Sequence, residues 1–178
     1  PPAPIGLIAG GGRLPVIVAD GLMSMGYPVH ALGLTHQYDE ILPRICTSFQ
    51  RVGVLRVGGW GRLLRQCDVR HAIMVGRVDK AGFMHNPWNI VQNLPDWRTL
   101  FVWFRRLRHD RRSHAVLSAI ADELARNGVH LLDSTLPITQ SLAEAGVMTK
   151  KQPSADQRGD VTFAWPLLAQ TLRLDIGQ

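Results

Sequence analysis

The chain has 178 residues, 46% of them hydrophobic, and a formal net charge of +6. This length and composition favour one ordinary core with an attached segment, in a soluble globular protein. The apolar stretches are interrupted well before the roughly 18 to 20 residues that a membrane-spanning helix needs, and no signal peptide opens the chain, so we expect a cytoplasmic protein.

The positive charge comes mostly from arginine, whose planar guanidinium binds phosphate through two hydrogen bonds. Nucleotide, nucleic acid and acidic membrane all remain open as partners at this point. The two cysteines, Cys46 and Cys67, lie outside any CxxC spacing and are too few for a disulfide framework, which predicts reduced thiols. Because the chain opens with Pro1 and Pro2 and stops without a closing element, we expect a fragment.

The first half of the sequence predicts strands that alternate with helices. An apolar run at residues 5–9 ends in three glycines, and Pro15 suits the first turn of a helix that runs to about Met25 and stops at Gly26. A second strand is predicted at residues 29–34 and a third at 52–57. A glycine turn at residues 58–61 then leads into a helix at 62–66 and a strand at 71–75, which Gly76 ends.

The second half is less regular. A loop with Pro87 and Pro95 precedes a predicted helix from Asp96, where Trp97 and other apolar residues recur at helical spacing, and a basic cluster follows at residues 105–112. Another helix carries apolar residues from 116 to 124 and leads to a strand at 129–132. We expect residues 160–174 to be helical, with a kink or a late start at Pro166.

These elements predict an α/β fold: a Rossmann-like, largely parallel sheet with helices on both faces, followed by a helical segment of a truncated second domain. A polar stretch near residues 149–154 indicates an exposed connection. We therefore place a Rossmann-like domain at residues 1–145, and the connection and first helix of a second domain at 146–178.

The glycine turn after the first strand is the clearest candidate for chemistry. Gly10, Gly11 and Gly12 could bring backbone N–H groups close to a pyrophosphate at a helix N-terminus, or could form only a tight strand-to-helix turn. Pro15 stands where the third glycine of a dinucleotide fingerprint belongs, and the second strand ends at Leu34, Thr35 and His36 without a ribose-binding acid. NAD is therefore disfavoured, and the missing GK[ST] excludes a Walker loop.

Other chemistry finds little support in the sequence. The seven histidines form no HxH, HxxxH or Cys/His cluster typical of a metal site, and the acidic residues are few and dispersed. The helix from Trp97 with its arginine tail supports three interpretations: core packing with a solvated basic face, a phosphate or nucleic-acid patch, and a peripheral membrane contact.

Five sequence segments resemble the LpxI family of bacterial UDP-2,3-diacylglucosamine pyrophosphatases. They are GLIAGGGRLP at residues 6–15, GGWGR at 58–62, MVGRV at 74–78, VMTKKQPS at 147–154 and LDIGQ at 174–178. The resemblance spans nearly the whole chain. It departs at Ser113 and His114, where the family has two adjacent aspartates, and in a basic, tryptophan-containing insertion at residues 87–112.

The resemblance implies Mg²⁺-assisted hydrolysis of an acylated UDP-sugar to UMP and diacylglucosamine 1-phosphate, in lipid A biosynthesis. It implies that the catalytic residues belong to an absent C-terminal domain, so we assign no catalyst, expect no bound cofactor and expect this chain to be inactive alone. Cleavage of a phosphoanhydride needs cationic and N–H donors. The candidate substrate-binding residues are Gly10, Gly11, Gly12, Arg13, Gly61, Gly76, Arg77, Thr149, Lys150 and Lys151.

The expected partners rest on this resemblance together with the tryptophan- and arginine-rich segment at residues 97–112 and the apolar residues near Phe163. They are the acylated UDP-sugar, the absent C-terminal domain, the inner membrane surface and a second copy of the chain, whereas nucleic acid is disfavoured. A non-catalytic module that binds a nucleotide sugar or nucleic acid remains the alternative function.

Overall fold

The computed structural model describes residues 2–78 and 113–173. Its strands are β1 (Ile5–Ala9), β2 (Val29–Leu34), β3 (Ser48–Val52), β4 (His71–Val75) and β5 (His130–Leu131). Its helices are α1 (Leu14–Ser24), α2 (Leu42–Ile45), α3 (Val57–Gln66), α6 (Ser113–Arg126) and α7 (Ala155–Arg173), with a 3₁₀ helix, η2, at Leu136–Ser141. The helix predicted from Asp96 and the basic cluster at 105–112 lie outside the described residues.

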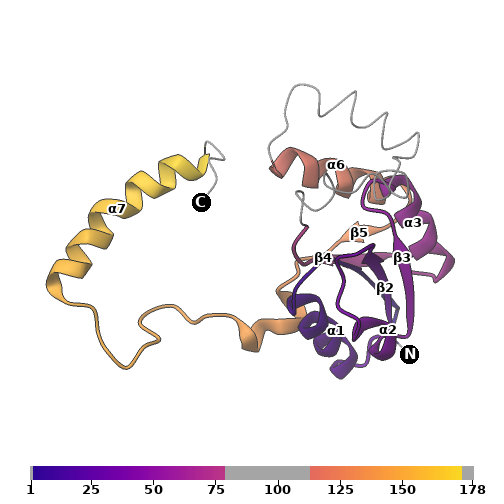
Figure 1. Ribbon diagram of the computed structural model, residues 1–178, viewed down its shortest axis with the longest axis horizontal. Helices are drawn as coiled ribbons and strands as arrows, with labels where there is room; N and C mark the ends of the chain where they lie inside the picture. The colour runs from indigo at the N-terminus through magenta and orange to yellow at the C-terminus, as the bar shows by residue number, and fades with distance from the viewer. Residues whose placement is uncertain (1, 79–112, 174–178) are drawn as a thin grey trace. The chain divides into compact units, whose positions relative to one another are not determined.

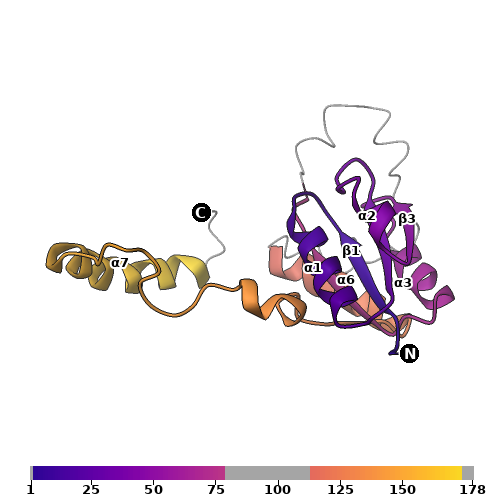
Figure 2. The same ribbon diagram turned by 90° about the horizontal axis from the view of Figure 1, so that it is seen from below.

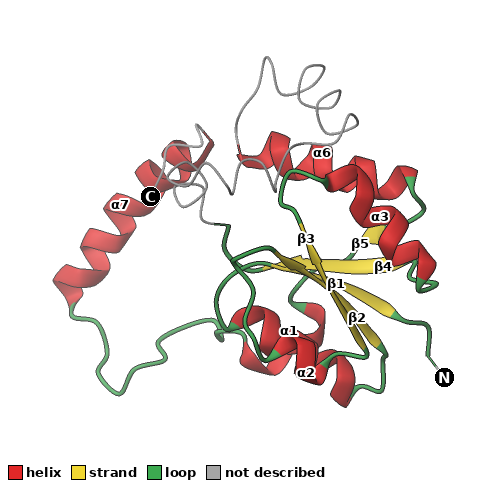
Figure 3. Ribbon diagram, turned by 45° about the vertical axis from the view of Figure 1, so that its right-hand side comes forward, coloured by secondary structure: helices red, strands yellow, loops and turns green. Residues whose placement is uncertain are grey.

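The five strands form one parallel sheet in the order β3-β2-β1-β4-β5. Helices cover both faces, with α1 and α2 on one and α3 and α6 on the other (Figures 1 and 3). The strand β1 leads from the N-terminal end into the middle of this arrangement (Figure 2). The predicted Rossmann-like α/β fold is therefore confirmed.

Both faces of the central strand are buried, which explains its continuous apolar sequence. Leu7 and Ala9 belong to the core on the side of α1 and α2, and Ile8 belongs to the core on the side of α3 and α6. Leu7, Ile8 and Ala9 have no exposed surface. The sheet thus carries two separate hydrophobic layers.

Three helices end in the same way, with a residue of positive φ just after the last turn. Gly26, Asp68 and Gly128 have φ values of 84°, 58° and 75°. In each case the N–H of the following residue donates to a carbonyl five residues earlier, as Tyr27 does to Leu22 at 3.1 Å. This Schellman geometry turns each helix sharply towards its next strand.

The third strand was predicted wrongly. It occupies Ser48–Val52 instead of residues 52–57, at the edge of the sheet, with Gln50 and Arg51 exposed. The apolar residues that suggested a strand, Val54 and Val57, instead pack against the α3 and α6 core.

The expected glycine turn at 58–61 was also wrong, because α3 already begins at Val57 and includes these glycines. Trp60 is buried in this helix, and its indole Nε1 donates to the Gly53 carbonyl at 3.1 Å. The short α2 was not predicted. Its Leu42 is completely buried, and Asp39 accepts a hydrogen bond from the Ile41 amide at 2.9 Å just before it.

The C-terminal elements differ from their predicted bounds. The last strand has only two residues, and α7 begins at Ala155, so the late start at Pro166 was wrong. Ser154 and Gln157 form a capping box: the Gln157 amide donates to the Ser154 hydroxyl at 3.2 Å, and the Ser154 amide donates to Gln157 Oε1 at 2.9 Å. This cap explains where the helix begins.

The chain divides into two compact units, residues 1–140 and 141–178. The first contains the sheet and its helices. The second contains α7, whose Phe163 and Trp165 are among its exposed large side chains. No described helix is both long and apolar enough to span a membrane.

Candidate phosphate-binding site

The candidate site lies where the strand order of the sheet reverses. From β1 the chain moves to β2 and β3 on one side, and it later crosses to β4 and β5 on the other. In open α/β sheets, ligands bind outside the carboxyl ends of the strands at such a switch point. Here the segments that follow β1 and β4 form this edge, and both were selected from the sequence as candidate binding segments.

Gly11 and Arg77 join these two segments by a reciprocal pair of backbone hydrogen bonds. The Gly11 amide donates to the Arg77 carbonyl at 2.8 Å, and the Arg77 amide donates to the Gly11 carbonyl at 2.9 Å. The Gly10 amide also donates to the Val75 carbonyl at 2.9 Å. The amides of Gly10 and Gly11 are therefore used within the protein, so they are not the donors that a phosphate would find.

The contact between the two segments requires glycine. A Cβ on Gly10 would lie 2.7 Å from the Arg77 carbonyl oxygen, and a Cβ on Gly76 would lie 2.7 Å from the Gly10 carbonyl carbon. Gly76 also has a φ of 107°, a backbone conformation that residues other than glycine rarely adopt. These two glycines allow the backbones of the segments after β1 and β4 to come into contact, so their structural role is to hold these two segments together.

The N-terminus of α1 supplies the available donors at this edge. Among the described residues, nothing accepts a hydrogen bond from the amides of Gly12, Arg13 and Leu14. Arg13 is the N-cap residue and makes no side-chain capping bond, and Pro15 in the first turn has no N–H to satisfy. Gly12, with a φ of 95°, has open space where a side chain would stand.

The turn after β2 borders the same glycines. A Cβ on Gly11 would lie 3.0 Å from the Gln37 carbonyl oxygen. The Gln37 amide donates to the Leu34 carbonyl at 2.9 Å, and the amide and hydroxyl of Thr35 both lie 3.0 Å from the Val52 carbonyl, to which they donate. The segments after β1, β2 and β4 therefore meet around Gly11.

This edge carries both cationic and acidic side chains. The side chains of Arg13 and Arg77 are both exposed there. Asp133, after β5, accepts hydrogen bonds from the amide and the hydroxyl of Thr135, each at 2.8 Å. These bonds lower the pKa of the Asp133 carboxyl and commit it to the local turn. The arrangement suits an anionic ligand, with backbone donors and cationic side chains on the same edge.

The profile described as the LpxI N-terminal domain matches residues 4–141, well over half of the chain. The chain belongs to the LpxI N-terminal domain family. The matched residues include both segments of the candidate site and the turn after β2.

A curated relative of this LpxI family member extends over a longer sequence. UDP-2,3-diacylglucosamine pyrophosphatase LpxI of Caulobacter vibrioides is 28% identical over 177 residues, which are 98% of this chain and 59% of the relative. The chain thus spans about three fifths of that relative's length.

Among solved structures, the UDP-glucose 4-epimerase of Thermus thermophilus in complex with NAD is 18% identical, with a TM-score of 0.43 over 71% of this chain and 35% of that one. The Bordetella bronchiseptica enzyme WbmH in complex with NAD⁺ is 11% identical, with a TM-score of 0.41 over 73% of this chain and 54% of that one.

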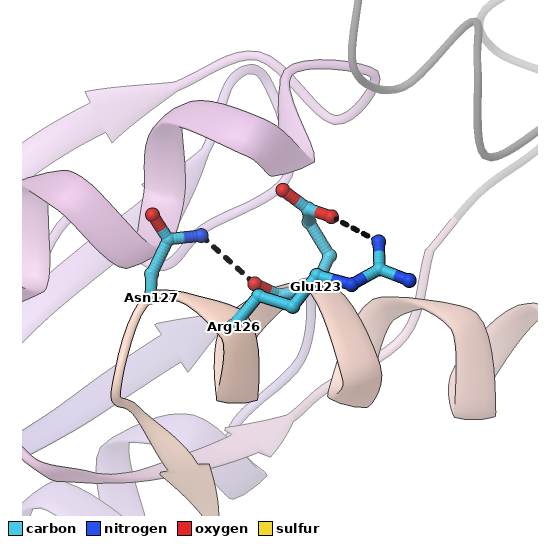
Figure 4. A network of polar contacts seen from close by, with 3 residues as sticks. All are labelled: Glu123, Arg126 and Asn127. Carbon is cyan, nitrogen blue, oxygen red and sulfur yellow. Dashed lines mark hydrogen bonds and ion pairs between the residues drawn. The ribbon is translucent and has the colours of Figure 1, made fainter.

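One candidate binding residue of the LpxI domain lies away from this edge. Gly61 is in α3, and a Cβ there would lie 2.6 Å from the Cβ of Asn127 at the end of α6. Asn127 Nδ2 donates to the Glu123 carbonyl at 2.8 Å, and the buried Glu123 pairs with Arg126 at 2.9 Å (Figure 4). This environment gives Gly61 a role in helix packing, and its substrate-binding role stays a prediction.

Thr149, Lys150 and Lys151 belong to the second unit, beyond the LpxI domain match. All three are exposed, and the Thr149 hydroxyl donates to the Lys151 carbonyl at 2.8 Å. Their binding role stays a prediction as well. Within residues 2–78 and 113–173, no three His, Cys, Asp or Glu side chains are grouped to hold a metal ion.

Sequence reasoning missed the turn after β2 as part of the site. It used His36 only to note that a ribose-binding acid was lacking. The signal was its place directly after the second strand, beside the segment that follows the first, where nucleotide-binding sheets hold the ribose.

Proposed function

We propose that this chain binds the phosphate-bearing part of an acylated UDP-sugar at the carboxyl edge of its sheet, as the N-terminal part of a UDP-2,3-diacylglucosamine pyrophosphatase. The reaction would give UMP and 2,3-diacylglucosamine 1-phosphate on the way to lipid A. The bridge between Gly11 and Arg77 supports the proposal most directly, because it brings two glycine-containing segments together at the switch point. The identity of the proposed substrate is taken from the family and from the name of the Caulobacter relative.

The physical case for a phosphate rests on the donors at this edge. A helix N-terminus carries about half a positive charge and unpaired N–H groups, which is a favourable setting for an anion. The amides of Gly12, Arg13 and Leu14 provide such groups in the described structure. Arg13 and Arg77 add two permanent cations that can each bind phosphate through paired hydrogen bonds.

The described residues do not make a site for Mg²⁺, since no three suitable side chains are grouped among them. In the proposal, Mg²⁺ and the attacking water belong to residues of the longer enzyme, and this chain orients the pyrophosphate and neutralises its charge. Docking on the inner membrane and pairing of two chains remain predictions.

The proposal is tested by isothermal titration calorimetry of the 178-residue chain with UDP and with inorganic pyrophosphate, at low and high salt. Binding should weaken with salt, and Arg77→Ala should reduce the affinity by about tenfold, the effect of one charged hydrogen bond. Arg70→Ala is the matched control, because this exposed arginine precedes β4, at the opposite edge of the sheet. Equal losses in both variants would indicate non-specific attraction and contradict the proposed site.

A further inference from the structure

The backbone of His36 has a conformation that is energetically unfavourable for a residue with a side chain. The turn from Leu34 to Gln37 closes with a hydrogen bond of 2.9 Å, and its third residue, His36, has a φ of 65°. Positive φ at this place in a β-turn is typical of glycine or asparagine, because a Cβ crowds the backbone. A sequence that only needed the turn would favour glycine here.

No local interaction of the side chain explains this choice. His36 is exposed, so its imidazole contributes little to the hydrophobic core. Among the described residues, no group forms a hydrogen bond or an aromatic contact with its ring. Strain at a residue without a structural purpose is a reason to look for a function.

The position of His36 indicates what that function is. The turn follows β2, and the carbonyl of the next residue, Gln37, lies 3.0 Å from the place of a Cβ on Gly11. His36 is therefore next to the segment that carries the proposed phosphate donors. In sheets of this topology, the residue after the second strand contacts the ribose when the phosphate lies at the first glycine turn.

We propose that His36 binds the ribose hydroxyls of the nucleotide and so selects a uridine nucleotide over a bare pyrophosphate. An imidazole offers one N–H donor and one acceptor nitrogen in its neutral form, which match a ribose diol. This inference rests on the proposed function, since it requires the phosphates to lie at the Gly12 to Leu14 amides.

The test compares stability and binding in the same variants. His36→Gly should raise the Tm by a few degrees, because it relieves the turn. The same change should weaken UDP binding by about 5- to 10-fold, the loss of one hydrogen bond, and leave the affinity for inorganic pyrophosphate unchanged. Asp68→Gly is the matched control, because Asp68 also has a positive φ, of 58°, at the end of α3. The Tm of this variant should also rise, while its affinity for UDP stays the same.

A second nucleotide identifies the group that His36 contacts. The wild-type chain should bind 2′-deoxy-UDP more weakly than UDP, and His36→Gly should bind the two equally. Equal UDP affinity in the wild-type chain and in His36→Gly would overturn the role of His36 and leave the phosphate site standing. If the wild-type chain binds neither UDP nor pyrophosphate, the proposed site fails and the role of His36 fails with it. A lower Tm for His36→Gly would contradict the argument from the turn.

Discussion

Gly10 and Gly76 touch backbone to backbone, so that a Cβ built on Gly76 would lie 2.7 Å from the Gly10 carbonyl carbon. Most of the candidate site depends on this contact. It holds the segments after β1 and β4 at the distance at which Gly11 and Arg77 can bond to each other.

The contact predicts that Gly76→Ala destabilises the first unit. The new Cβ would overlap with backbone, which cannot move aside as a flexible side chain can, and it would adopt an unfavourable φ. We expect a loss of about 2 to 4 kcal/mol in the free energy of unfolding, measured by urea denaturation. Gly59→Ala is the control, because its Cβ would meet nothing within 4 Å and α3 should gain stability. Equal stability of the two variants would contradict the contact.

Variants at Gly61 distinguish a role of this glycine in helix packing from a role in substrate binding. Gly61→Ala should cost about 1 to 3 kcal/mol despite the better helix propensity of alanine, because its Cβ would meet Asn127. Asn127→Gly removes the opposing Cβ, so the double variant should recover much of the loss, which thermal unfolding measures. A folded Gly61→Ala variant that loses UDP affinity would instead support the substrate-binding role predicted from the sequence.

Cys46 should react slowly with alkylating reagents. Burial, and secondarily the charge of Asp20, raises the pKa of the Cys46 thiol to about 11. In a Cys67→Ser variant, the iodoacetamide rate should therefore rise with pH up to about 11, and Asp20→Asn should lower the midpoint slightly. Because the pKa is higher in the folded state, this thiol contributes stability below its unfolded pKa, and the contribution is lost as the pH rises towards 11. A rate that levels off at the ordinary pKa of a thiol would contradict the effect of partial burial on Cys46.

The chain by itself should release no UMP from UDP-2,3-diacylglucosamine at any Mg²⁺ concentration, although it unfolds cooperatively. Its described part supplies a packed core but no group of acids for metal-assisted attack. Chromatographic detection of UMP provides the measurement. Mg²⁺-dependent release would refute the idea that catalysis lies outside this chain and would direct attention to Asp79, Asp133, Asp156 and Asp160.

The sequence predicted the centre of the fold better than its margins. The strands β1, β2 and β4 have the predicted bounds because each is a mostly buried and mostly apolar run bounded by glycine, proline or polar residues. The strand β3 carries exposed polar residues at the edge of the sheet, so no apolar run marks it. The start of α7 did have a signal, since Ser154 and Gln157 have capping-box spacing, but the polar residues around them predicted a loop instead.

The sequence predicted which segments form the candidate site, but it did not predict how their backbones are hydrogen-bonded to each other. The glycines after β1 and β4 stand out in the sequence, and parallel pairing implies that they share an edge. The sequence does not show that Gly10 and Gly11 use their amides within the protein, which moves the expected phosphate donors to Gly12, Arg13 and Leu14. Only the backbone conformation shows that His36 adopts a positive φ.

The reciprocal hydrogen bonds of Gly11 and Arg77 also couple the hydrogen exchange of the loops that follow β1 and β4. Each amide is held by the carbonyl of the other residue, so neither can exchange with solvent until both loops part. The two protons should therefore exchange at matching rates, although many residues separate them along the chain. A ligand that binds across the edge should slow both equally, so either amide resonance can report whether the site is occupied.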